Sequence, residues 1–370
     1  MTFKVKIEKV VYQGYGLGYH EGKTVFVYKG IPGEELEVKV DKTQKNILFC
    51  SIVNRSDNIS NIDCCIERYA PSVYNYEDTL PNKYSDTVAP PISSKAPLID
   101  CGACIYSNVS YNQQLEYKKS ILNEIFKNLY QNIDFLPSPQ INYYRNKIYL
   151  PLKKTNQETK IGMYAHKTHD IVEHKSCLLY PDKITRIIDD IRNCKFCSDI
   201  VIYSLSSIGF RYSSDLSSIL IDISTDKSDV LTQEEITILT TKHHEITGII
   251  NYGKTLYGDL YYYEKFAHLN LKININSFFQ INPKQALVIY DQIEKFINVN
   301  EFVVDAYCGM GTIGMYIAKK VKLVVCIDSS QTSIFNGEEN AKINKIENIE
   351  FINKSFEAIS NKLKNVDTIL

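Results

Sequence analysis

The sequence has no tryptophan, almost no net charge and no long apolar run, and each absence narrows the class of protein. A net charge of −1 gives no overall attraction to a polyanion, so any nucleic acid must bind local basic patches. No apolar run reaches the roughly 18 residues of a membrane-spanning helix, and no signal pattern opens the chain. We therefore expect a cytoplasmic protein without a membrane anchor, and a monomer.

Cysteine and tyrosine are abundant instead. Ten cysteines in a chain without a secretion signal are expected to be thiols or metal ligands rather than disulfides. The 27 tyrosines suggest surfaces on which bases stack, although a codon bias toward Tyr, Asn, Lys and Ile explains them as well. With 370 residues, the chain can form two or three domains with buried cores.

The most informative stretch is a glycine turn between two apolar segments, residues 302–306 and 323–328. The pattern predicts strand, turn, helix and strand, with Gly309, Gly311 and Gly314 in the turn and Asp328 ending the second strand. Glycines let the backbone approach a ligand closely, and an acid about 20 residues later can bond two ribose hydroxyls. The stretch therefore predicts a nucleotide-cofactor site.

Two cofactor classes fit this outline. The three glycines form a formal GxGxxG motif, so a dinucleotide-dependent enzyme is one reading. Asp305 weakens it, because an acid before the first glycine would repel the phosphates of a dinucleotide. S-adenosylmethionine (SAM) has no phosphate and carries a sulfonium and an ammonium, which an acid would attract. A glycine turn that binds no cofactor is the third reading.

The rest of the chain divides by pattern. Apolar and polar residues alternate through the first 54 residues, with glycines between the segments, which predicts a small antiparallel barrel. Proline and serine interrupt the following stretch, and helical spacing returns at residues 111–130. Strands dominate residues 141–263, with one helix near residues 182–192, and Asn282-Pro283 predicts the start of another helix.

The expected fold is therefore α/β with three parts. They are an OB-like barrel (1–56), a central mixed α+β domain (99–270) after an irregular insertion (57–98), and a Rossmann-like domain (271–370) on which helix 111–130 is expected to pack. In the central domain, Tyr144, Arg145 and Lys147 combine aromatic rings with cations and are the best candidates for contacting RNA. A solvated, charged edge strand is the alternative.

Four motifs in order along the chain carry a family resemblance. They are CGAC (101–104), YRNK (144–147), SFFQINP (277–283) and VDAYCGMGTIG (304–314). Together they resemble the RNA (uracil-5-)-methyltransferase family, in particular its 23S rRNA branch, whose members begin with a TRAM barrel. The resemblance implies a class I methyltransferase domain that binds SAM. It implies cofactor contacts from Gln280, Asp305, Tyr307, Gly309, Gly311, Thr312, Asp328 and Ser355.

In this family a cysteine thiolate adds to uracil C6, the resulting enolate takes the methyl group, and a base removes the C5 proton. The motifs that bear the nucleophile and the base would follow Leu370, so we expect no catalytic residue in this sequence, and a fragment or a poorly stable chain. Cys308 is the nearest substitute, but a thiol there is expected to pack beneath the cofactor.

The resemblance also implies a [4Fe-4S] cluster, because Cys101, Cys104 and Cys177 match three of its four ligand positions. The fourth position corresponds to Ala96-Pro97, and Cys64 or Cys65 could replace it. A zinc site that also uses Cys194 and Cys197, or no metal at all, are the alternatives.

These observations favour SAM-dependent methylation of uracil C5 in RNA, with 23S rRNA as the first substrate and tRNA as the second. The alternatives are a non-catalytic RNA-binding remnant of such an enzyme and a dinucleotide-dependent oxidoreductase.

Overall fold

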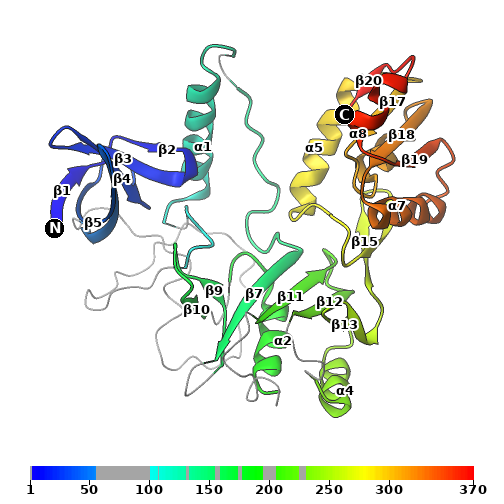
Figure 1. The fold of residues 1–370 in the computed structure, drawn as a ribbon, viewed down its shortest axis with the longest axis horizontal. Helices are drawn as coiled ribbons and strands as arrows, with labels where there is room; N and C mark the ends of the chain where they lie inside the picture. Colours follow the sequence, from blue (N-terminus) through cyan, green and yellow to red (C-terminus); the bar gives the residue numbers. More distant parts are fainter. Residues whose placement is uncertain are drawn as a thin grey trace. The chain divides into compact units, whose positions relative to one another are not determined.

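The computed structural model describes residues 2–55, 101–106, 108–130, 133–154, 159–173, 177–194, 206–224 and 231–370. Its contacts divide the chain into two units, residues 1–137 with 163–176 and residues 138–162 with 177–370 (Figure 1). The predicted insertion at residues 57–98 lies outside the described residues, and the predicted domain borders stay predictions. In the described part of the chain, no helix is long and apolar enough to cross a membrane.

The first unit begins with a curled six-stranded sheet whose strand order is β1-β5-β6-β4-β3-β2. Its elements are β1 (Thr2–Lys6), β2 (Lys9–Val11), η1 (Tyr12–Gly14), β3 (Tyr15–His20), β4 (Lys23–Tyr28), β5 (Glu35–Gln44) and β6 (Ile47–Arg55). The alternating apolar residues share one core with Val5, Val25, Val38 and Leu48 at its centre. Alternation therefore folds this sheet as the sequence predicts, because period-two residues share one face.

Two further segments complete the first unit. Helix α1 (Tyr111–Phe126) begins at a capping box formed by Ser110 and Gln113. Strands β9 (Met163–Tyr164) and β10 (Ile171–Val172) form a short hairpin, and Ala165 in its loop bridges to Cys101. A segment from the middle of the chain thus groups with the barrel.

A mixed six-stranded sheet of order β14-β13-β12-β11-β7-β8 opens the second unit. Its strands are β7 (Lys147–Lys154), β8 (Thr159–Ile161), β11 (Ser206–Tyr212), β12 (Ile219–Ser224), β13 (Ile246–Asn251) and β14 (Lys254–Gly258), and its helices are α2 (Asp182–Arg192) and α4 (Gln233–Lys242). Helix α2 was predicted and α4 was not. The signal for α4 is the capping box between Thr232 and Glu235, which the surrounding β-branched residues obscure.

A hairpin of β15 (Tyr261–Phe266) and β16 (Leu269–Asn274) follows this sheet. Its outer edge is covered by three asparagines of α7 (Gln331–Ile343) and its C-cap. Asn336, Asn340 and Asn344 bond backbone groups of Asn274, Lys272 and Asn270 at 2.7 to 3.1 Å. These side chains replace the ladder of a neighbouring strand, because an amide offers both a donor and an acceptor.

The last part of the second unit is a parallel sheet of order β19-β18-β17-β20. Its elements are α5 (Pro283–Phe296), β17 (Phe302–Ala306), α6 (Thr312–Ile317), β18 (Leu323–Asp328), α7, β19 (Ile349–Asn353), α8 (Phe356–Ile359), η3 (Ser360–Lys362) and β20 (Thr368–Ile369). Val303 and Val324 face one core, while Val304 and Val325 face the other. Helices thus cover both faces, and the expected Rossmann-like domain is confirmed.

Candidate cofactor site

The turn between β17 and α6 contains three residues in the left-handed region, with φ of 56° at Tyr307, 58° at Gly309 and 71° at Gly311. A Cβ built on Gly311 would lie 2.7 Å from Cε1 of Phe351, so packing requires glycine there. A Cβ on Gly309 would meet no atom within 4 Å. The backbone of Gly309 is therefore open on one side, where a ligand can approach it closely.

Asp328 ends β18 beside this turn. Its Oδ2 accepts a hydrogen bond from Gly309 N at 2.8 Å, and its Oδ1 accepts one from Ser330 N at 2.8 Å. Two backbone amides thus fix the carboxylate at the edge formed by the carboxyl ends of parallel strands, where ligands of such sheets bind. The bond to ribose expected for Asp328 stays a prediction.

Asp305 lies in a different environment from the one expected. Its side chain is 3% exposed, and its Oδ2 accepts a hydrogen bond from Gly314 N at 3.0 Å. Burial raises the pKa of this carboxyl to about 7, and the neighbouring Asp328 adds to the shift. The carboxyl lies under the turn and holds the start of α6. Repulsion of a dinucleotide by an exposed charge at Asp305 is therefore unsupported, and its direct contact with a cofactor stays a prediction.

Tyr307 and Ser355 follow the strands on either side of β18. The Tyr307 side chain is 66% exposed, and its hydroxyl donates to Glu357 Oε1 at 2.5 Å. Ser355 is exposed just before α8, and its carbonyl accepts from Ala358 N. Tyr307, Asp328 and Ser355 therefore lie at or just after the carboxyl ends of three adjacent strands. Sequence reasoning missed Glu357, whose only signal is its position in the first turn of a short helix.

Two other predicted site residues, Thr312 and Gln280, are less exposed than Tyr307 and Ser355. Thr312 is 6% exposed at the start of α6 and bonds the hydroxyl of Tyr290 in α5. Gln280 is half-buried, and its carbonyl accepts from Asn146 Nδ2 at 3.0 Å. The backbone N–H of Asn146 also donates to the carbonyl of Ile281 at 3.0 Å. Two of the recognised motifs, residues 144–147 and 277–283, are therefore joined through Asn146.

The predicted RNA-contacting residues lie where the chain enters β7. Tyr144, Arg145 and Lys147 are each half-buried. The Arg145 amide donates to Leu179 O at 3.1 Å. The Lys147 ammonium lies 5.2 Å from the centre of the Tyr149 ring, and burial together with Arg211 lowers its pKa. These residues combine cations with aromatic rings, but their contact with RNA stays a prediction.

An aromatic cluster on the barrel was not predicted. His166, from the β9–β10 loop, stacks on Tyr28 at 3.5 Å between ring centres, and its Nε2 lies 3.2 Å from the Tyr15 hydroxyl. Lys167 lies 4.9 Å above the Tyr15 ring and 5.1 Å above Phe49. The cluster joins residues that are far apart in sequence, so no local pattern identifies it.

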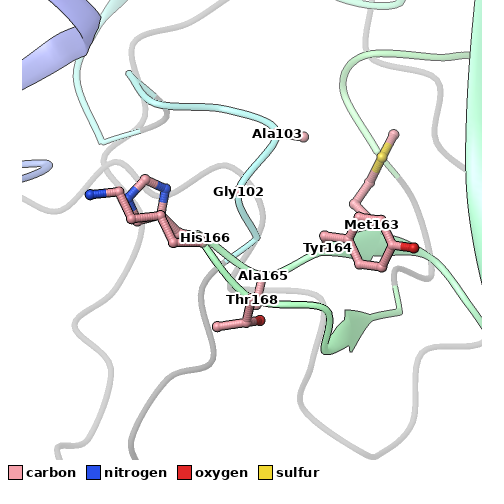
Figure 2. Close-up of a pocket in the computed structure, with 8 residues that line it drawn as sticks. Gly102, Ala103, Met163, Tyr164, Ala165, His166 and Thr168 are labelled. Atoms are coloured by element: carbon pink, nitrogen blue, oxygen red, sulfur yellow. The ribbon is translucent and has the colours of Figure 1, made fainter.

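The cysteine motif lies beside the same loop. A pocket of about 330 Å³ is lined by Gly102, Ala103 and residues 163–168 (Figure 2). Cys101 is buried next to it and Cys104 is half-buried, whereas Cys177 belongs to the other unit. Within the described ranges, no three His, Cys, Asp or Glu side chains are grouped to hold a metal. Cys64, Cys65 and Cys197 lie outside those ranges, so the described donors alone do not fit a cluster or a zinc ion.

Comparisons with known proteins agree with this architecture. Residues 1–53 match the TRAM domain and residues 297–370 match a methyltransferase domain. An uncharacterised RNA methyltransferase of Fusobacterium nucleatum is 30% identical over 99% of this chain and 80% of its own length. One from Clostridium acetobutylicum is also 30% identical, over 95% of this chain and 76% of its own length.

A solved structure has the same fold along the chain. The tRNA (uracil-54, C5)-methyltransferase of Pyrococcus abyssi, in complex with S-adenosyl-L-homocysteine, superposes over 99% of this chain and 82% of its own, with a TM-score of 0.71 and 19% identity. With sequence relatives matched along nearly the whole chain, the protein belongs to the same family of RNA methyltransferases, and its residues 1–53 form a TRAM domain.

Proposed function

We propose that the protein binds SAM at the edge formed by Gly309 and Asp328 and directs its methyl group to C5 of uracil in RNA. The observation that carries the proposal is the fold shared along the chain with a tRNA (uracil-54, C5)-methyltransferase bound to S-adenosyl-L-homocysteine (SAH). The open backbone at Gly309 and the fixed carboxylate of Asp328 supply the two features that a nucleoside cofactor needs.

The proposal gives each of these site residues a role in binding the cofactor. Gly309 allows the cofactor to approach the backbone, and Asp328 accepts bonds from the ribose hydroxyls. Gly311 keeps the turn tight, Asp305 and Thr312 hold the start of α6, and Ser355 lies near the adenine. Tyr307 faces the ligand from the end of β17. SAM supplies an electrophilic methyl group on a sulfonium, which uracil C5 attacks once a nucleophile has activated the ring.

The thiols of the described methyltransferase domain do not fit this nucleophile. Cys308 Sγ donates to the carbonyl of Gly309 at 3.3 Å, and Cys326 is fully buried. Burial raises the pKa of the Cys326 thiol well above its ordinary value, which opposes thiolate formation. The steps assigned to the described residues are therefore binding and orientation of the cofactor and of RNA.

For RNA we assign Tyr144, Arg145 and Lys147, with 23S rRNA as the first substrate and tRNA as the second. The test uses the protein purified after expression from its own gene, with SAM and unmodified 23S rRNA or tRNA transcripts, and mass spectrometry of the digested nucleosides. We expect 5-methyluridine in the rRNA and its absence with the Asp328→Ala variant. 5-Methyluridine in the tRNA alone would reassign the substrate. Binding of RNA and SAH without methyl transfer would favour the non-catalytic alternative.

Cofactor identity has its own measurement. Calorimetry with SAH and with NADH separates the methyltransferase from an oxidoreductase, and we expect SAH to bind and NADH not to bind.

The iron-sulfur proposal, with Cys101, Cys104 and Cys177 as ligands, is tested by the visible spectrum of anaerobically purified protein. A broad absorbance near 400 nm, a rough expectation for iron-sulfur charge transfer, supports the cluster. Its absence together with absence of bound iron would contradict it.

A further inference from the structure

Tyr307 and Glu357 form a bridge across the edge of the parallel sheet. Tyr307 follows β17, and Glu357 lies in the first turn of α8, after β19. Their side chains meet through the 2.5 Å bond from the Tyr307 hydroxyl to Glu357 Oε1. The strands lie in the order β19-β18-β17 (Figure 1). The bridge therefore crosses the end of β18, whose last residue is Asp328.

The left-handed backbone conformation of Tyr307 is unusual and points to a ligand site beside the bridge. A φ of 56° is rare for a residue with a large side chain, since the left-handed region costs free energy for any residue with a Cβ. Such outliers are maintained only where surrounding contacts hold them, and they concentrate at ligand sites. The chain is anchored after Tyr307, where Cys308 N donates to Ile327 O at 3.0 Å and Gly309 N donates to Asp328 Oδ2 at 2.8 Å. Before Tyr307, Ala306 N donates to Leu370 O at 3.2 Å.

The Tyr307 side chain itself has little support from packing. The ring is 66% exposed, and its nearest aromatic neighbour is Phe356, at 5.7 Å between ring centres and 54° between planes. An exposed tyrosine otherwise moves among rotamers on a fast timescale. The bond to Glu357 is therefore the contact that selects one orientation of the ring.

We propose that Glu357 is a positioning residue for the cofactor site, which holds the Tyr307 ring across the carboxyl edge so that SAM meets a preformed aromatic wall. The inference rests on the proposed function and extends it to a residue that the motifs do not include. A preformed wall lowers the entropy lost on binding, so the bridge increases affinity for the cofactor.

The charge of Glu357 gives the bridge a pH dependence. The bond to Tyr307 lowers the pKa of the Glu357 carboxyl and raises the pKa of the Tyr307 hydroxyl. Glu357 therefore accepts the bond as a carboxylate at neutral pH, and the charge-assisted bond is lost as the pH falls through the lowered pKa. The Ser355 side chain also bonds the Glu357 carboxyl and lowers its pKa.

The test is calorimetric titration of SAH into the wild type, Glu357→Ala, Glu357→Gln, Tyr307→Phe and the double variant Tyr307→Phe with Glu357→Ala. We expect Glu357→Ala and Tyr307→Phe each to weaken SAH binding by roughly three- to tenfold, the effect of one lost hydrogen bond. The double variant should be no weaker than either single one, and Glu357→Gln should retain part of the affinity. Glu347→Ala, an exposed acid before β19, is the matched control.

The outcomes separate this inference from the proposed function. No SAH binding by the folded wild type would contradict both. Wild-type binding with unchanged affinity in the Glu357 and Tyr307 variants would overturn the bridge alone. Additive losses in the double variant would also overturn it, because two independent contacts add. Thermal melts verify folding, and the wild type should lose its advantage over Glu357→Gln at acidic pH.

Discussion

The side-chain amide of Asn340 pairs with the backbone of Lys272 as a neighbouring strand would. Its Oδ1 accepts from Lys272 N at 2.7 Å and its Nδ2 donates to Lys272 O at 2.9 Å. Asn340 is fully buried, and Asn336 and Asn344 extend the same pairing along the hairpin edge. A helix therefore closes the edge of β16.

Replacing Asn340 should destabilise the second unit. Asn340→Ala leaves the Lys272 amide without its buried acceptor, which costs roughly 1 to 3 kcal/mol. Asn340→Asp keeps the shape but removes the donor and buries a charge, so its loss should be larger. Urea denaturation measures both, with the less buried Asn344→Ala as the comparison. Equal stability of Asn340→Ala and wild type would contradict this role.

The two glycines of the turn should respond differently to a methyl group. Gly311→Ala places Cβ against Phe351 and Cys326 and also strains a φ of 71°, so folding and SAH binding should both weaken. Gly309→Ala meets no neighbouring atom and incurs only backbone strain, of the order of 1 to 2 kcal/mol. We expect it to fold and to lose SAH affinity, which melting and calorimetry together measure.

Asp305 should make the protein less stable as the pH rises. Its pKa is about 7 in the folded protein against an ordinary value of 3.8, so between these values the folded state holds a proton that the unfolded state has released. The free energy of unfolding therefore falls between about pH 4 and pH 7. Asp305→Asn should flatten this part of the profile. The measurement is denaturation at pH 5 and pH 7.5, and parallel profiles would contradict the assignment.

His166 should stabilise the first unit, although it lies more than 100 residues after the barrel strands in the sequence. His166→Ala removes the stack on Tyr28 and the contact with the Tyr15 hydroxyl, with an expected cost of about 1 to 2 kcal/mol. Faster proteolysis of the barrel is the expected result. The exposed His169→Ala serves as control, and equal digestion rates for both variants would argue against the role.

Sequence reasoning succeeded where the information is local. The glycine turn, Asp328 and the alternation of the barrel follow from spacing, so the fold class was predicted and is confirmed. Contacts between distant residues were not predictable in the same way. The asparagines of α7 read as an ordinary polar helix face, and nothing local links Glu357 to Tyr307.

Asp305 shows a second kind of limit. Its spacing before the glycines places it at the end of β17, as the pattern predicts, but a sequence pattern does not tell on which side of a strand end a carboxyl is buried. Helix α4 has a local signal in the capping box of Thr232 and Glu235, but its β-branched residues favour a strand by propensity.

The loop that carries His166 also sets an order of events during synthesis. All six barrel strands have been made by Arg55, yet the residue that stacks on Tyr28 follows about 110 residues later. At roughly 5 to 20 residues per second, the ribosome needs about 5 to 20 s to add it. Throughout that interval the Tyr28 ring lacks the imidazole that stacks on it, and the barrel acquires its final surface only after residue 166 has been added.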